Sequence, residues 1–98
     1  MKLPVRIREE AEVDLSDAAI WYEQQRVGLG QEFLDRDLSV LESLPDHPTQ
    51  YPVVHNGVRR ALLGRLPFGI FDNVENEFIL IYAVMHARRH PRRWQGRT

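Results

Sequence analysis

The 98-residue sequence contains no cysteine, which excludes a disulfide framework, a thiolate nucleophile and a cysteine-ligated zinc site. Its longest apolar run, Phe78 to Met85, is far shorter than the roughly 20 residues that a helix needs to cross a bilayer. The N-terminus becomes charged before any apolar stretch of signal-peptide length appears. We therefore expect one small domain over residues 1–98, located in the cytoplasm and without a membrane partner.

The formal net charge of -1 hides an uneven distribution of charge along the chain. Residues 1–46 hold five basic and eleven acidic residues, whereas residues 47–98 hold eight arginines and three acids. The tail, residues 86–98, contains five arginines, two histidines, one tryptophan and no acid. Because guanidinium groups bind carboxylate and phosphate, this tail predicts a contact with nucleic-acid phosphate, an acidic protein partner or the chain's own acidic half.

The hydrophobic pattern of the first half predicts a strand and a helical hairpin. Apolar and basic residues alternate over Val5–Arg8, which is typical of a half-buried strand. From about Glu9 the apolar residues recur at helical spacing, until Gly28-Leu29-Gly30 interrupts them. A second helical pattern follows and ends at Pro45. Two helices joined by a short glycine turn are expected to pack antiparallel.

The second half is predicted to form a loop followed by a meander of strands. Residues 45–57 hold three prolines, an asparagine and a glycine, which favours a loop. Three apolar segments follow, separated by short turns, and the last has almost no polar interruption, so we expect it in the middle of the sheet. The predicted strands are Val58–Leu63, Pro67–Phe71 and Phe78–Met85. The fold class is therefore α+β, with an N-terminal strand and an antiparallel helical hairpin packed on a three- to four-stranded antiparallel sheet.

Two motifs suggest ligand sites only weakly. The pair Gly28-x-Gly30 follows a helix rather than a strand, so a turn explains it better than a dinucleotide loop. His86 and His90 stand at a spacing that can hold a metal on one helix face, but Pro91 disfavours a helix there. We expect no metal and no cofactor. His86 is either a group that moves a proton at neutral pH or a structural histidine bonded to the backbone.

Trp94 lies beside two arginines near the end of the chain. It is interpreted as a latch that packs the tail onto the domain, in preference to a platform for a base. The pair Trp21-Tyr22 is interpreted as core and hairpin packing. Arg59 and Arg60 are adjacent in a predicted strand, so only one of them joins a given face; with Arg65 and the tail they are expected to form a basic end of the molecule.

Several segments form a pattern that extends over nearly the whole chain. The segments are Ala11-x-x-Asp14-Leu15-x-x-Ala18-x-x-Trp21-Tyr22-Glu23-x-Gln25, Gly28-Leu29-Gly30-x-x-Phe33-Leu34, His47-Pro48-x-x-Tyr51-Pro52, Arg59-Arg60, Leu66-Pro67-Phe68-Gly69-Ile70-Phe71 and Ala83-Val84-x-His86-x-Arg88-Arg89-x-Pro91-x-x-Trp94. Taken together and in this order, they resemble the RelE/ParE superfamily of bacterial toxins. One departure from the family is Asp72-Asn73, which puts the length of that strand in question.

The resemblance implies the toxin of a type II toxin–antitoxin pair, held inactive by a cognate ParD/RelB-like antitoxin whose N-terminal part binds operator DNA. The toxin itself would meet operator DNA only through that antitoxin. The glycine-turned hairpin and the ending of the chain look closer to ParE-like members, which poison DNA gyrase without catalytic residues. The alternatives are a RelE-like endoribonuclease that cleaves messenger RNA on the ribosome, and an inactive remnant that only binds its antitoxin.

The two activities imply different roles for the same basic residues. For RNA cleavage the candidate catalytic residues are Arg59, Arg60, Arg65 and His86, although no lysine follows Lys2 and no tyrosine follows Tyr82. For binding of a target or antitoxin, the candidates are Arg59, Arg60, Arg65, His86, Arg88, Arg89, Arg92, Arg93 and Trp94.

Overall fold

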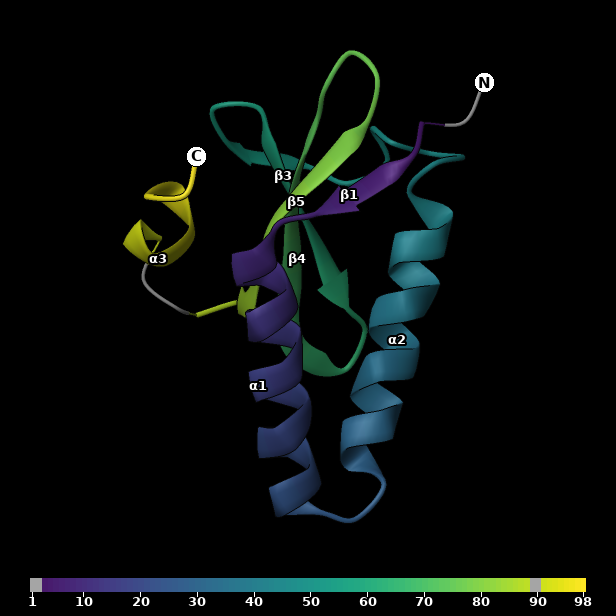
Figure 1. The fold of residues 1–98 in the computed structure, drawn as a ribbon, viewed down its shortest axis with the longest axis vertical. Coiled ribbons are helices and arrows are strands. Elements are labelled where there is room, and N and C mark those ends of the chain that lie inside the picture. The colour runs from purple at the N-terminus through teal and green to yellow at the C-terminus, as the bar shows by residue number, and fades with distance from the viewer. Residues whose placement is uncertain (1–2, 89–90) are drawn as a thin grey trace.

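A computed structural model of the chain describes residues 3–88 and 91–98. The N-terminal strand leads into two long helices, and four further strands and a short helix follow (Figure 1). The elements are β1 (Val5–Ile7), α1 (Glu9–Gln25), α2 (Leu29–Ser43), β2 (Val53–His55), β3 (Val58–Leu63), β4 (Leu66–Val74), β5 (Ile79–His86) and α3 (Arg92–Gln95).

The helical hairpin predicted from the glycine turn is confirmed. Gly28 adopts a left-handed conformation with φ of +89°, which a residue without a Cβ adopts at no steric cost. The carboxylate of Glu23, in the last turns of α1, accepts the backbone N–H groups of Gly28 and Gly30 at 3.0 Å. Gly30 also lets the helices approach closely, because a Cβ there would lie 2.6 Å from the carbonyl oxygen of Ala19.

The five strands form one sheet in the order β1-β5-β4-β3-β2. The prediction of an antiparallel sheet is confirmed for β2 to β5 and wrong for β1, which pairs parallel with β5, with Val5 opposite Ile79. The loop predicted over residues 45–57 contains the additional edge strand β2. Strand β4 runs through Asp72-Asn73 to Val74, beyond the predicted end at Phe71, because its backbone continues to pair with β5 after a register shift at Phe71/Asp72.

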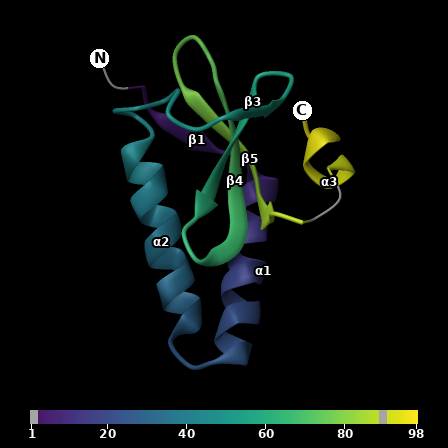
Figure 2. The ribbon, with the colours of Figure 1, turned by 180° about the vertical axis from the view of Figure 1, so that it is seen from behind.

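The helical hairpin covers one face of the sheet, while α3 lies beside the sheet on the side of α1 (Figures 1 and 2). A core cluster between hairpin and sheet includes Phe33, Leu44 and Ile81, and a second cluster on the opposite face includes Phe71 and Trp94. Strand β5 contributes to both clusters, and Ile81 to Met85 are buried throughout. The prediction that both faces of this strand are covered is thereby confirmed. Its predicted place inside the sheet is confirmed for Ile79–Ile81, which have β1 on one side and β4 on the other, and is wrong for the rest of the strand, which pairs with β4 alone among the described residues.

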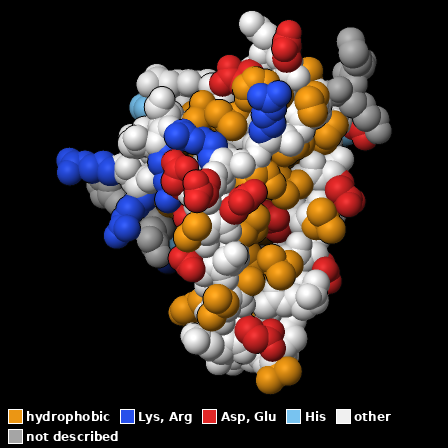
Figure 3. Space-filling view, in the orientation of Figure 1, with side chains coloured by type: hydrophobic (Ala, Val, Ile, Leu, Met, Phe, Trp, Pro, Cys, Tyr) orange, Lys and Arg blue, Asp and Glu red, His pale blue; other side chains and the backbone are white. Residues whose placement is uncertain are grey.

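Charge is distributed unevenly over the surface, in keeping with its distribution along the chain. Arginine side chains gather on the side of the molecule that holds α3, while acidic side chains are scattered over the two long helices (Figure 3). Asp37 in α2 is an exception, since it is buried. Within residues 3–88 and 91–98, no helix has the length and apolar character required to span a bilayer.

Candidate functional site

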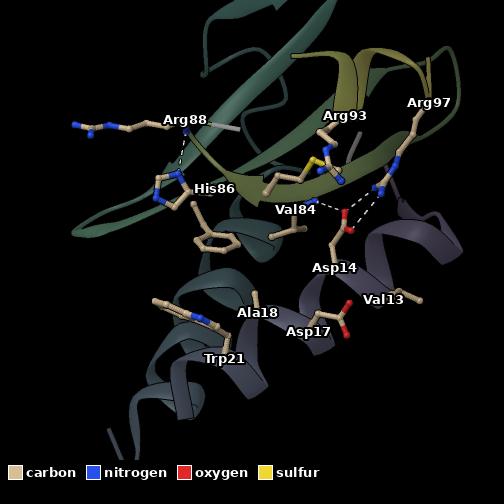
Figure 4. Close-up of a pocket in the computed structure, with 12 residues that line it drawn as sticks. Val13, Asp14, Asp17, Ala18, Trp21, Val84, His86, Arg88, Arg93 and Arg97 are labelled. Carbon is tan, nitrogen blue, oxygen red and sulfur yellow. Dashed lines mark hydrogen bonds and ion pairs between the residues drawn. The ribbon is translucent and has the colours of Figure 1, made fainter. Parts of the chain in front are cut away.

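A groove lies between α1, the end of β5 and the C-terminal segment (Figure 4). Its volume is about 1000 Å³, and it is partly open to solvent. Apolar side chains line it beside groups of both charges, so that it can hold a polypeptide segment with apolar and charged residues. The lining residues are Val13, Asp14, Asp17, Ala18, Trp21, Phe68, Val84, Met85, His86, Arg88, Arg93 and Arg97.

Helix α1 contributes five side chains to the groove, and three of them form a stripe along the helix. Asp14, Ala18 and Trp21 are spaced four and three residues apart, so they lie on one side of the helix. The small side chain of Ala18 is buried, whereas 53% of Trp21 is exposed. Trp21 makes an edge-to-face contact with the buried ring of Tyr22, at 5.2 Å between centroids. The interpretation of this pair as core is therefore confirmed for Tyr22 and wrong for Trp21, which offers an aromatic surface to the groove.

Among the described residues, no strand neighbours β5 beyond Ile81 on the edge that borders the groove. Strand β1 pairs with β5 only as far as Ile81, where the N–H of Arg8 donates to the Ile81 carbonyl at 3.1 Å before α1 begins. Past this point side chains take the place of a strand. The carboxylate of Asp14 accepts the N–H of Val84 at 3.0 Å, and the guanidinium of Arg97 donates to the carbonyl of Tyr82 at 3.2 Å.

Asp14 and Arg97 also form an ion pair with each other. One guanidinium nitrogen lies 2.6 Å from Oδ2 of Asp14, and the second lies 3.3 Å from Oδ1. The side chains are 14% and 23% exposed for Asp14 and Arg97, so water screens the pair less than it would at the surface. Arg8 donates a further hydrogen bond to the backbone carbonyl of Arg97. Neither Asp14 nor Arg97 was among the site residues predicted from sequence, because the two residues are distant in the chain. The segment of α1 that begins Ala11-x-x-Asp14 was the sequence feature that could have drawn attention to Asp14.

The latch predicted for Trp94 is confirmed. Its ring is buried, stacks on Phe71 at 4.6 Å between centroids and makes an edge-to-face contact with His55 at 5.7 Å. Trp94 therefore packs on the face of the sheet opposite the hairpin, while Arg97 reaches the edge of β5. The C-terminal segment is held at both places.

His86 is the last residue of β5 and lines the groove. Its ring packs edge-to-face against Phe68 at 5.7 Å, and its Nδ1 accepts the backbone N–H of Arg88 at 3.0 Å. The accepting role of Nδ1 places the proton of the neutral ring on Nε2. This bond is the one expected of a structural histidine. His90, its suggested partner in metal binding, lies outside the described residues.

The arginines predicted to form one basic end are separated by the fold. Arg59 and Arg60 point to opposite faces of β3: Arg59 donates to the carbonyls of Tyr51 at 2.6 Å and Thr49 at 3.3 Å, whereas Arg60 extends over Gly69. Arg65 is exposed in the turn between β3 and β4. Arg59 and Arg60 therefore lie on opposite faces, as the alternation of the strand predicts, so only one of them can share a face with the other basic residues.

The tail arginines have different positions. Arg88 and Arg93 line the groove, and among the described residues neither has an ion-pair partner. Arg92 is exposed on α3 and does not line the groove. Arg89 lies outside the described residues. In the described parts of the chain, no group of three or more histidine or acidic side chains is arranged to hold a metal ion.

Two buried carboxyl groups lie away from the groove. Asp72 in β4 is fully buried, and neither of its carboxylate oxygens has a hydrogen-bond partner within the described residues. Burial raises the pKa of Asp72 to about 7, against an opposing effect of the positive charge of Arg59. Burial likewise raises the pKa of Asp37 in α2 to about 6. Both carboxyls therefore carry less charge at neutral pH than acids at the surface, and they belong to the core.

Comparison with known proteins identifies the family to which the sequence is similar. Residues 5–91 match the family model described as the ParE toxin of the type II toxin–antitoxin system parDE. A solved structure described as the chromosomal ParDE TA system from P. aeruginosa has a chain of similar fold, with a TM-score of 0.77 and 19% sequence identity. The similarity covers 87% of this chain and 96% of that one. No curated protein matches the sequence.

Proposed function

This chain belongs to the ParE toxin family of type II toxin–antitoxin systems, and from that membership we propose that it inhibits DNA gyrase and is neutralised by a cognate antitoxin bound in the groove. An inhibitor of this kind acts by binding another protein, so it needs a recognition surface rather than catalytic groups. The described groove has a suitable composition, with apolar and aromatic side chains beside two arginines that have no ion-pair partner among the described residues.

The separation of two candidate nuclease residues, His86 and Arg60, is the observation that carries this proposal. Cleavage by a 2′-hydroxyl needs a proton acceptor, a proton donor and cations around one phosphate. His86 pairs across the sheet with Phe68, on the face covered by the hairpin, whereas Arg60 pairs with Phe71, on the opposite face. The sheet therefore lies between His86 and Arg60, and Arg59 is engaged by backbone carbonyls. This arrangement favours gyrase inhibition over cleavage of messenger RNA.

The groove also supports an antitoxin as the first partner. Arg88 and Arg93 attract carboxylates, while Trp21 and Phe68 offer apolar surface to the same segment. A disordered segment that combines acidic and apolar residues would gain both charge pairing and apolar burial when it folds onto this surface. The structural similarity to a chain of a ParDE system is in keeping with such a partner.

A supercoiling assay tests the proposed activity. Purified, folded toxin is expected to inhibit supercoiling by gyrase or to trap cleaved DNA, and pre-incubation with the antitoxin is expected to restore activity. Trp21→Ala should weaken the inhibition, whereas Val27→Ala should leave it unchanged, because Val27 is 90% exposed in the turn of the hairpin and does not line the groove. Normal supercoiling at a large excess of folded toxin would refute the proposal.

Two parallel measurements separate the alternatives. Cleavage of ribosome-bound messages at codon positions, lowered about 100-fold by His86→Ala, would replace gyrase inhibition with ribonuclease activity. Induction of the toxin without antitoxin is expected to arrest growth with a DNA-damage response. Normal growth under that induction would identify an inactive chain that only binds its antitoxin.

A further inference from the structure

Asp14 lies where α1, the open edge of β5 and the C-terminal segment meet (Figure 4). We propose that Asp14 is a positioning residue, which fastens the C-terminal segment to α1 and β5 and thereby places Arg93 in the wall of the groove. The expected effect of Asp14 on antitoxin binding rests on the proposed function. The expected effect of Asp14 on the position of the C-terminal segment does not, and it can be tested without a partner.

The contacts of Asp14 reproduce those that a neighbouring strand would make. Its carboxylate accepts the N–H of Val84, as a strand carbonyl would, and holds Arg97 so that the guanidinium donates to the carbonyl of Tyr82. The edge of β5 is thus closed by two side chains from opposite ends of the chain. Hydrogen bonds between charged groups are stronger than those between neutral ones, so the ion pair is well suited to anchor the segment.

The C-terminal segment depends on such anchors for its position. Helix α3 contains only four residues, and a helix this short has little stability of its own. Trp94 fixes the segment on the far face of the sheet, and Arg97 fixes it at the edge beside the groove. Arg93 directly precedes Trp94 in sequence and lines the groove. Loss of the anchor at Arg97 would therefore weaken the hold on this short helix and, with it, the position of the cation that Arg93 offers to a partner.

Single substitutions can separate the two roles of the carboxylate. Asp14→Asn keeps an acceptor oxygen for the N–H of Val84 but removes the charge that holds Arg97. Arg97→Gln removes the same ion pair from the other side. Asp17→Asn is the matched control, because Asp17 lies one turn further along α1, is exposed and has no ion-pair partner among the described residues.

The structural part is tested by the fluorescence of Trp94. The chain has two tryptophans, so Trp21→Phe leaves Trp94 as the single reporter. In that background, Asp14→Asn is expected to raise the population with an undocked tail about tenfold, seen as a red-shifted emission and stronger quenching by acrylamide. Asp17→Asn is expected to change neither. Emission and quenching of Trp94 that stay unchanged in both Asp14→Asn and Arg97→Gln would overturn the proposal.

The functional part is tested by a double-mutant cycle on chains that keep Trp21. Affinity for the purified cognate antitoxin is expected to fall about tenfold in Asp14→Asn and in Arg97→Gln, and no further in the double variant. Losses that add in the double variant, or an affinity that stays constant while the tail undocks, would overturn the role of Asp14. If the wild-type toxin fails to inhibit gyrase while Trp94 responds as expected, the proposed function fails and the positioning of the tail stands.

Discussion

Replacement of the buried acid Asp72 by asparagine is expected to stabilise the fold at alkaline pH and to remove much of its pH dependence. The side chain of Asp72 is fully buried, and its carboxylate oxygens lack hydrogen-bond partners among the described residues. Its cross-strand neighbour Arg59 donates to the carbonyls of Tyr51 and Thr49 rather than to the carboxylate. Ionised Asp72 is therefore poorly compensated in the folded state.

The sign and size of the effect follow from the pKa of Asp72. Burial raises this pKa from 3.8 to about 7, so the folded state binds the proton more tightly than the unfolded state does. The resulting stability is fully present below pH 3.8 and is lost as the pH rises to 7 and slightly beyond. At about 1.4 kcal/mol for each pH unit, the total loss is about 4 kcal/mol, and about 3 kcal/mol of it falls between pH 5 and pH 8.

Asparagine keeps the shape of the side chain and stays neutral at every pH. The difference in unfolding free energy between Asp72→Asn and the wild type should therefore shift in favour of the variant by about 3 kcal/mol from pH 5 to pH 8. Urea denaturation followed by circular dichroism at pH 5, 6, 7 and 8 measures it. Asp35→Asn is the control, since Asp35 is exposed, and its pH profile should parallel that of the wild type. If the unfolding free energies of Asp72→Asn and the wild type differ by the same amount at pH 5 and at pH 8, the reasoning is refuted.

Three further predictions concern packing and a second buried acid. Trp94→Ala is expected to lower the unfolding free energy by about 3–5 kcal/mol in urea denaturation, whereas Trp21→Ala, at a half-exposed position, should cost less than about 1 kcal/mol. Equal losses would contradict the assignment of one ring to the core and the other to the groove. Gly30→Ala is expected to cost about 1–3 kcal/mol, since its Cβ would meet the carbonyl of Ala19 at 2.6 Å; an unchanged thermal midpoint would refute that close approach. In the wild type, ionisation of Asp37 is expected to lower the unfolding free energy by about 3 kcal/mol as the pH rises from 3.8 to about 6, and Asp37→Asn should remove this loss. A variant with the same pH profile of stability as the wild type would contradict the burial of a charged group at this position.

Much of the fold could be predicted because the relevant signals are local. The glycine turn sets the hairpin, and the apolar run of β5 indicates a strand that is covered on both faces. The latch of Trp94 was also foreseeable from an aromatic residue in a basic tail. Strand β2 was missed because it has only three residues, lies between turn-forming residues and exposes both of its valines. The parallel partner of β1 was missed because no local pattern specifies which strand a short edge strand will join.

The candidate site was less predictable because its geometry depends on contacts between distant residues. Asp14 and Arg97 meet only after the sheet has formed, so their spacing in the sequence gives no sign of the pair. Arg59 and Arg60 are adjacent, yet the alternation of β3 sends them to opposite faces. His86 and Arg88 were expected at the site, and both line the groove. Trp21 was assigned to the interior because aromatic residues in amphipathic helices are more often buried than exposed.

The parallel pairing of β1 with β5 has a consequence for the order of folding. Val5 lies opposite Ile79, so the first strand finds its partner only after most of the chain has been synthesised. The hairpin of α1 and α2, by contrast, is built from contacts close in sequence and is expected to form early, on the timescale of local helical structure. Pairing of β1 with β5 closes the long stretch of chain between them, and this closure is costly in conformational entropy. We therefore expect the sheet to be completed slowly and late in folding. Until then, the apolar face of the hairpin stays exposed, and the groove between α1 and β5 has only one wall.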